Sequence, residues 1–272
     1  MTADSNFEFD RIRQPNTSGQ RFRIMTQVVG ALIIRDMKTR FGRSAAGFFL
    51  AQGLPFAHLA LLVIIYKILG RSAPLGNDPI TFFSLGVLCY VVFAYPYLQI
   101  VRSTLDNKPL LYFPRVKLID ILIARCALEI LGACVVCVNV IVAMLLFGVE
   151  FSPHDFPLVL VAFASALYFG ISFGVLIASV CVLWPPLAYA GSLLRALFWG
   201  GSAAFYLPDM LPNLVREIVY YNPLAHSIEL ARVAYYDDFS SNLLDPTFLF
   251  WAPTFILALG LVVMDATRRF VH

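Results

Sequence analysis

The sequence predicts an all-α integral membrane protein with six transmembrane helices. Its 272 residues are 60% hydrophobic and only 14% charged, and the mean hydropathy is +0.77. A soluble domain is nearer half apolar and a quarter charged. The apolar residues also gather in separate runs near the length of about 20 residues that crosses a bilayer as a helix. We therefore expect lipid to solvate one face of most of the helices.

Six runs in the domain 45–272 are predicted to span the membrane: 45–69, 80–102, 118–148, 156–183, 186–207 and 247–267. The third run has about 31 residues, so its helix would be about 46 Å long at a rise of 1.5 Å per residue. A hydrocarbon core is only about 30 Å thick. We therefore expect the first turns of this helix, with Asp120 and Arg125, to extend into the cytoplasm.

Residues 1–20 are polar and lack the apolar stretch of a signal peptide, which predicts a flexible cytoplasmic tail. Residues 21–44 combine basic residues with apolar residues at helical spacing. This pattern predicts an amphipathic helix in the cytoplasmic interface, with the alternative of a short soluble helix. Its apolar stripe, expected to face lipid, comprises Ile24, Val28, Ala31, Leu32 and Met37. The basic residues expected to contact anionic headgroups are Arg35, Lys38, Arg40 and Arg43.

The distribution of Lys and Arg predicts the orientation. With both termini in the cytoplasm, about fifteen of these residues lie inside and about four outside, as the positive-inside rule requires. Segment 208–246 falls between the last two spans and contains two short apolar runs broken by prolines. These runs predict a re-entrant helical segment on the outer side, with an ordinary outer loop as the alternative.

Charged residues inside apolar spans are functional candidates because their burial in lipid is costly. Glu129 follows Arg125 by four residues, so a local ion pair between them is the simplest interpretation. Arg195 has no acidic neighbour along its own span, and it could pair with Glu129 or bind an anionic cargo. Four aromatic residues could stack on sugar rings along a glycan path, although membrane-interface contacts and packing also explain them: Tyr95, Tyr97, Phe198 and Trp199.

Several motifs of other protein classes find little support. The chain contains no Gly-Lys pair, so it lacks a Walker A loop, and any ATP-driven step needs another chain. Gly170 and Gly174 match a nucleophile elbow, but inside an apolar helix their spacing favours close helix contact. Cys134 and Cys137 lie among apolar residues, which favours packing over metal binding. The four histidines show no metal-ligand spacing, and a net charge of +3 does not imply nucleic acid.

Four stretches together resemble the membrane permease of type-2 ABC exporters, specifically the branch that exports capsular polysaccharide. They are 31–43 with its Arg-Phe-Gly-Arg end, 107–117, 194–199, and 221–232 with its Asn-Pro-Leu-Ala-His-Ser-Ile-Glu-Leu block. The family usually carries Trp and Glu where this chain has Leu50 and Leu54. The resemblance otherwise extends over nearly the whole chain from about residue 21.

The resemblance implies a homodimeric permease of the bacterial inner membrane, with two ATP-binding subunits that bind ATP and Mg and no cofactor in this chain. It also implies a lipid-linked polysaccharide cargo, a periplasmic co-polymerase and an outer-membrane channel. Loop 104–117 would couple to the ATPase through Asn107, Lys108, Tyr112, Phe113, Arg115 and Lys117. The cargo canal would be lined by Arg195, Tyr95, Tyr97, Phe198, Trp199 and Glu129.

Three alternatives remain. A permease of the same architecture could carry another cargo, such as O-antigen, teichoic acid or a drug. An ion-coupled secondary transporter would depend on the proton gradient instead of an ATPase. A membrane-bound glycan-modifying enzyme would need a catalytic constellation that the sequence does not display.

Overall fold

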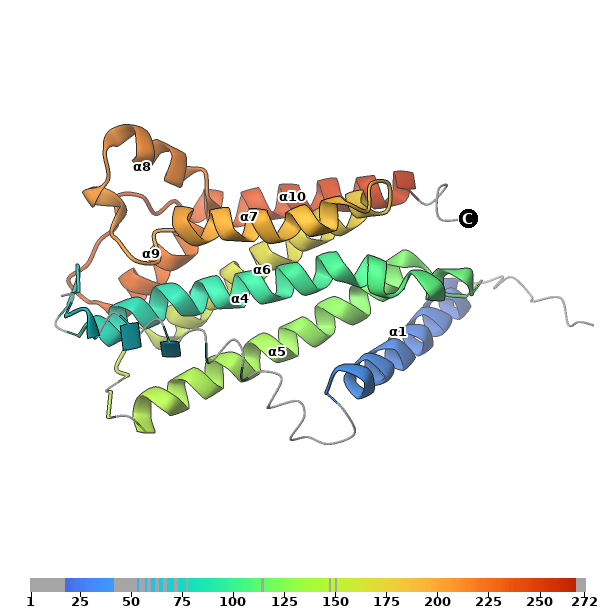
Figure 1. Cartoon of the computed structure of the whole chain (residues 1–272), viewed down its shortest axis with the longest axis horizontal. Helices are drawn as coiled ribbons and strands as arrows, with labels where there is room; N and C mark the ends of the chain where they lie inside the picture. Colours follow the sequence, from blue (N-terminus) through green and yellow to red (C-terminus); the bar gives the residue numbers. More distant parts are fainter. Residues whose placement is uncertain are drawn as a thin grey trace, which may run out of the picture.

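The computed structural model describes residues 18–41, 78–113, 115–146, 148–149 and 151–267, together with isolated positions between 53 and 76. All regular structure within these residues is helical, which confirms the predicted all-α class. The helices run side by side along the long axis of the molecule, with shorter helices at one end (Figure 1). The predicted first span, 45–69, falls mostly outside the described residues.

Among the residues that the structure describes, four helices have the length and composition to cross a membrane: α4 (Pro79–Asp106), α5 (Leu118–Leu146), α6 (Phe156–Cys181) and α10 (Pro246–Thr267). They match four of the six predicted spans within a few residues. The most apolar 18-residue window is 89% buried in α4 but only 22% buried in α10. Helix α4 packs against α5, α6, α7 and α9, and it is the most buried of the four candidate spans.

Small residues let α6 approach α4 closely. A Cβ atom added to Gly170 would lie 2.6 Å from the carbonyl oxygen of Phe93, and one added to Gly174 would lie 3.3 Å from that of Tyr97. The first distance is shorter than real Cβ contacts reach, and the second is tighter than nine in ten of them. The structure therefore confirms that these two glycines form a helix contact.

Gly170→Ala is expected to destabilise the bundle by roughly 1–3 kcal/mol, because the new methyl group forces α4 and α6 apart. Thermal unfolding of the detergent-solubilised protein measures this effect. Gly30→Ala is the matched control, since a Cβ atom there meets nothing within 4 Å. Equal melting temperatures for the two variants would show that the α4–α6 contact tolerates the extra volume.

Helix α7 (Leu187–Gly201) is shorter than the predicted span 186–207. Its 15 residues extend about 22 Å, less than the thickness of a hydrocarbon core. Beyond Gly201 the chain leaves the helix, and Ala203 adopts a left-handed conformation with φ of 60°. The predicted end at 207 is therefore wrong, and the count of six spans stays a prediction.

Segment 208–246 contains three short helical pieces: η2 (Pro208–Met210), α8 (Asn213–Tyr220) and α9 (Pro223–Tyr235). None reaches spanning length. Figure 1 places α8 and α9 at the opposite end of the bundle from α1 and the C-terminal end of α10. The re-entrant character of this segment stays a prediction.

Helix α1 (Ser18–Phe41) begins three residues before the predicted amphipathic helix and packs against α5. Leu32 is buried against Ile121 and Ala124, and Val28 packs beside it. The prediction that Leu32 faces lipid is therefore wrong, because α5 covers it, whereas Val28 is only half-buried. Met37, from the same predicted stripe, is exposed.

Candidate functional site

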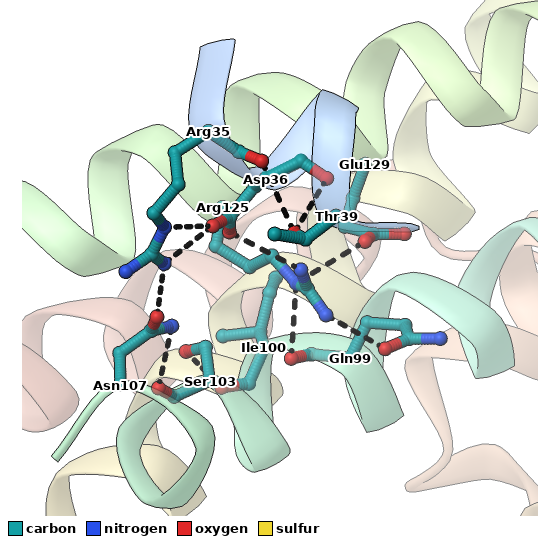
Figure 2. Close-up of polar contacts among 9 residues, drawn as sticks. All are labelled: Arg35, Asp36, Thr39, Gln99, Ile100, Ser103, Asn107, Arg125 and Glu129. Atoms are coloured by element: carbon teal, nitrogen blue, oxygen red, sulfur yellow. Dashed lines mark hydrogen bonds and ion pairs between the residues drawn. The ribbon is translucent and has the colours of Figure 1, made fainter. Parts of the chain in front are cut away.

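Buried charges connect α1, α4 and α5 at the end of the bundle where α1 lies, here called the α1 end (Figures 1 and 2). Arg125 of α5 is at the centre, and its side chain is only 5% exposed. Its guanidinium lies 3.5 Å from the carboxylate of Asp36 on α1 and 3.3 Å from that of Glu129 on its own helix. It also donates to the side-chain oxygen of Gln99 on α4 at 2.7 Å.

The same set of contacts reaches the loop after α4. Arg35 donates from Nε to the carboxylate of Asp36 at 3.0 Å and from Nη2 to the side-chain oxygen of Asn107 (Figure 2). Asn107 in turn donates to the carbonyl of Ser103 at 2.9 Å. We call this set the Arg125 network, and its members are Arg35, Asp36, Gln99, Asn107, Arg125 and Glu129. It bonds α1 and α5 to the residue at which α4 ends.

Loop 104–117 has one face inside the protein and one outside. It contains the short helix η1 (Lys108–Tyr112). Leu110 and Leu111 pack against clusters formed by α1, α5 and α6. Tyr112 and Phe113 are 84% and 61% exposed. The basic predicted coupling residues are exposed as well: Lys108, Arg115 and Lys117.

The other predicted contacts of α1 are only partly described. Lys38 is exposed on α1. The side chain of Arg40 and the whole of Arg43 lie outside the described residues. Their predicted contacts with lipid headgroups stay predictions.

Three of the predicted canal residues meet in an aromatic cluster between α4, α6 and α7. Tyr97 is fully buried and stacks on Phe173, with ring centroids 5.2 Å apart. Phe198 packs edge-on against Phe173 at 5.5 Å, and Trp199 lies 4.2 Å from the ring of Tyr90. In this structure the three rings therefore contact other aromatic rings.

The remaining canal candidates lie elsewhere. Tyr95 and Glu129 line a small cavity of about 20 Å³ between α4 and α5. Arg195 is half-buried on α7, and its backbone carbonyl accepts a hydrogen bond from the hydroxyl of Tyr90 at 3.2 Å. Glu129 pairs with Arg125, and no ion pair found among the described residues joins Arg195 to Glu129.

A second buried ion pair was not predicted as a site. Arg232 of α9 is fully buried and donates to Glu229 at 2.7 Å. It also donates to the carbonyls of Ala203 at 2.8 Å and Tyr206 at 3.0 Å, so it holds the chain after α7. The signal was present in the sequence, because Glu and Arg three residues apart on a helix can pair.

Nearby contacts join α8 and α9 to the start of α10. His226 donates from Nε2 to the carbonyl of Tyr220 at 2.7 Å, and its Nδ1 accepts from the backbone N–H of Asp245 at 3.1 Å. This pairing requires the neutral imidazole with its proton on Nε2. Tyr220 also donates its hydroxyl to the carboxylate of Asp245 at 3.1 Å. These hydrogen bonds therefore hold α8, α9 and the start of α10 together.

In the part of the chain that the structure describes, no group of side chains suits covalent catalysis or metal binding. No group of three or more His, Cys, Asp and Glu side chains in that part could hold a metal ion. Cys134 is exposed and Cys137 is half-buried on α5. The buried charges instead fix helices to one another and to an exposed loop.

The chain belongs to the ABC-2 type transporter family, whose model matches residues 23–236. Proteins of this family assemble with ATP-binding partners in ABC transporters.

The chain aligns with three relatives over most of its length. It is 26% identical over 249 residues to the capsule polysaccharide export inner-membrane protein CtrC of Neisseria meningitidis serogroup A, covering 89% of this chain and 91% of the relative. It is 24% identical over 256 residues to the capsule polysaccharide export inner-membrane protein BexB of Haemophilus influenzae, covering 91% and 94%. It is 26% identical over 214 residues to the polysialic acid transport protein KpsM of Escherichia coli, covering 78% and 83%.

Proposed function

We propose that this chain is the permease subunit of an ATP-driven exporter that moves lipid-linked capsular polysaccharide across the bacterial inner membrane. The observation that carries the proposal is the Arg125 network, which bonds α1 and α5 to the start of an exposed aromatic loop. Such an arrangement suits a chain that receives force from a partner and passes it to its helices. The names of the relatives, which align over most of this chain, supply the cargo class.

The ATP-binding subunits hold ATP and Mg and dock on loop 104–117. Tyr112 and Phe113 are the exposed anchors, with Lys108, Arg115 and Lys117 around them. Leu110 and Leu111 fix η1 to the helices behind it. When the subunits close on ATP, η1 moves, and the bonds from Asn107 through Arg35 and Asp36 to Arg125 carry α1 and α5 with it.

The cargo passes through a canal formed with a second copy of the chain, and both termini lie in the cytoplasm. Arg195 is the canal residue that this structure favours, because it is half-exposed and an acidic polysaccharide attracts a cation. Phe198 and Trp199 lie on the same helix and keep part of their surface accessible. A periplasmic co-polymerase and an outer-membrane channel carry the polysaccharide onward.

Export of capsule from cells tests this function. A strain lacking the chain is expected to accumulate polysaccharide inside the cell and to lose it at the surface. The intact chain restores export, whereas the double variant Tyr112→Ala, Phe113→Ala is expected to restore less than about a tenth, because aromatic anchors dominate docking energy. Surface and intracellular polysaccharide are quantified together.

Phe255→Ala on α10 is the matched control, since this ring is 69% exposed and lies far from the loop in sequence. Full export by the double variant would contradict docking at the loop. Normal surface polysaccharide in the deletion strain would contradict the cargo class, and co-purification with the ATP-binding subunit then decides whether the permease class still holds.

A further inference from the structure

One buried histidine joins three elements at the end of the bundle opposite α1. His226 of α9 is fully buried, and its ring lies 5.2 Å from the ring of Tyr220 on α8 and 5.0 Å from that of Phe248 on α10. Tyr220 and Phe248 also stack on each other at 5.7 Å. The imidazole is therefore enclosed by protein on all sides.

Both ring nitrogens of His226 are bonded to backbone groups. Nε2 donates to the carbonyl of Tyr220, and Nδ1 accepts from the backbone N–H of Asp245. An imidazolium carries a proton on each nitrogen and accepts no hydrogen bond. Protonation of His226 would therefore replace the bond to Asp245 by two N–H groups that point at each other, with their nitrogens 3.1 Å apart.

Asp245 connects this histidine to the start of α10. Its carboxylate accepts from the backbone N–H groups of Thr247 at 2.8 Å and Phe248 at 3.1 Å, as a helix cap does. It also accepts from the hydroxyl of Tyr220 at 3.1 Å. Displacement of Asp245 from His226 would therefore disturb the cap of α10 and its contact with α8 together.

The charges around His226 do not cancel the cost of burying an imidazolium. Two carboxylates act on it: Asp245 before α10, and Glu229 on its own helix, which already pairs with Arg232 at 2.7 Å. Burial lowers the pKa of His226 below its ordinary value of 6.5, because the charged form is desolvated. The bond to the carbonyl of Tyr220 and the two carboxylates raise this pKa, but by less.

We propose that His226 is a pH sensor, and that its protonation opens the corner formed by α8, α9 and the start of α10 and slows export. This inference rests on the proposed function, which places this end of the bundle in the periplasm. Protons of the medium reach it through the water-filled porins of the outer membrane. Helix α9 also carries Arg232, which holds the chain after α7, so the opening reaches the helix that carries Arg195.

Hydrogen exchange of the purified permease with its ATP-binding subunits measures the opening. In the open corner the imidazole is solvated and regains a pKa near 6.5. Acidification from pH 7.5 to 5.5 therefore raises the ratio of open to closed corner by up to about tenfold. We expect the protection of the Asp245, Thr247 and Phe248 amides, corrected for the intrinsic pH dependence of exchange, to fall by about that factor. The N–H of Phe248 lowers the pKa of Asp245, so its carboxylate stays charged over this range.

A variant without the titrating group isolates the sensor. His226→Gln keeps one side-chain donor and one acceptor, so we expect equal protection and equal export at both pH values. In the wild type, surface polysaccharide per folded permease is expected to fall several-fold from pH 7.5 to 5.5. His154→Gln is the matched control, because His154 is exposed at the same end, 3.2 Å from Asp237. It is expected to keep the wild-type response to pH.

The outcomes separate the inference from the proposed function. Unchanged protection of the wild-type amides between pH 7.5 and 5.5 would overturn the inference, and this measurement needs no variant to fold. Equal wild-type export at the two pH values, or the wild-type response in His226→Gln, would overturn it as well. Each of these results leaves export at pH 7.5 intact. Failure of the proposed function would instead appear at pH 7.5, as normal surface polysaccharide in the deletion strain.

Discussion

Replacing Arg232 by methionine is expected to unfold the protein to the point that most of the folded material is lost from the membrane fraction. Arg232 is fully buried, and its partner Glu229 is 1% exposed, so the variant leaves a buried carboxylate with no counter-charge. The carbonyls of Ala203 and Tyr206 lose their donor in the same step. Breaking one side of a buried pair costs about 3–5 kcal/mol, which is a large share of a total stability of about 5–15 kcal/mol.

The measurement is the amount of monodisperse protein extracted from membranes, followed by its thermal unfolding. Arg216→Met on α8 is the matched control, because Arg216 lies 3.6 Å from Asp209 in an exposed ion pair. Exposed pairs contribute about 0–1 kcal/mol, so this variant is expected to remain folded.

The double variant Arg232→Met, Glu229→Met is expected to recover part of the stability, since it removes both buried charges. Equal yields for Arg232→Met and Arg216→Met would contradict a structural role for the buried pair. The pair also fixes the chain after Gly201, so its loss is expected to release the end of α7.

Some features were predictable because their signal lies within a single helix. The long apolar runs gave α4, α5, α6 and α10 nearly at their observed ends, since length and composition alone define such helices. The pair of Arg125 and Glu129 was likewise predictable from a spacing of four residues. The glycines of α6 were predictable because small residues at this spacing permit close packing.

Other features depend on contacts between distant segments. Helix α7 ends where it does because Arg232 donates hydrogen bonds to the carbonyls of Ala203 and Ala204. These carbonyls then do not accept the hydrogen bonds that a longer helix would need. The face of α1 that packs on α5 cannot be chosen from periodicity, because Leu32 and Met37 are equally apolar in the sequence. Asp36 joins Arg125 only because α1 lies along α5.

Replacing Arg125 by methionine is expected to abolish export. The variant removes the ion pairs of Arg125 with Asp36 and Glu129, which are 7% and 8% exposed, and it removes the bond to Gln99, while Asp36 keeps its pair with Arg35. The loss of one buried partner costs about 3–5 kcal/mol, and here it also removes a charged contact between α1 and α5. Arg125→Lys is expected to restore export only in part, because an ammonium group lacks the fork that binds Asp36, Glu129 and Gln99 together. Surface polysaccharide per folded permease measures the effect.

Asp36→Asn separates force transmission from stability. This variant keeps the shape of Asp36 and leaves Arg125 paired with Glu129, so the bundle is expected to fold and to retain the ATP-binding subunit. The charged contact between α1 and α5 is lost, at a cost of about 1.5–3 kcal/mol for hydrogen bonds to charged groups. We therefore expect ATP hydrolysis to continue while export per hydrolysed ATP falls several-fold. Thr26→Ala on the exposed part of α1 serves as the control. An unchanged ratio of export to hydrolysis in Asp36→Asn would mean that the Arg125 network only stabilises the fold, and that movement of η1 reaches the helices through the packing of Leu110 and Leu111.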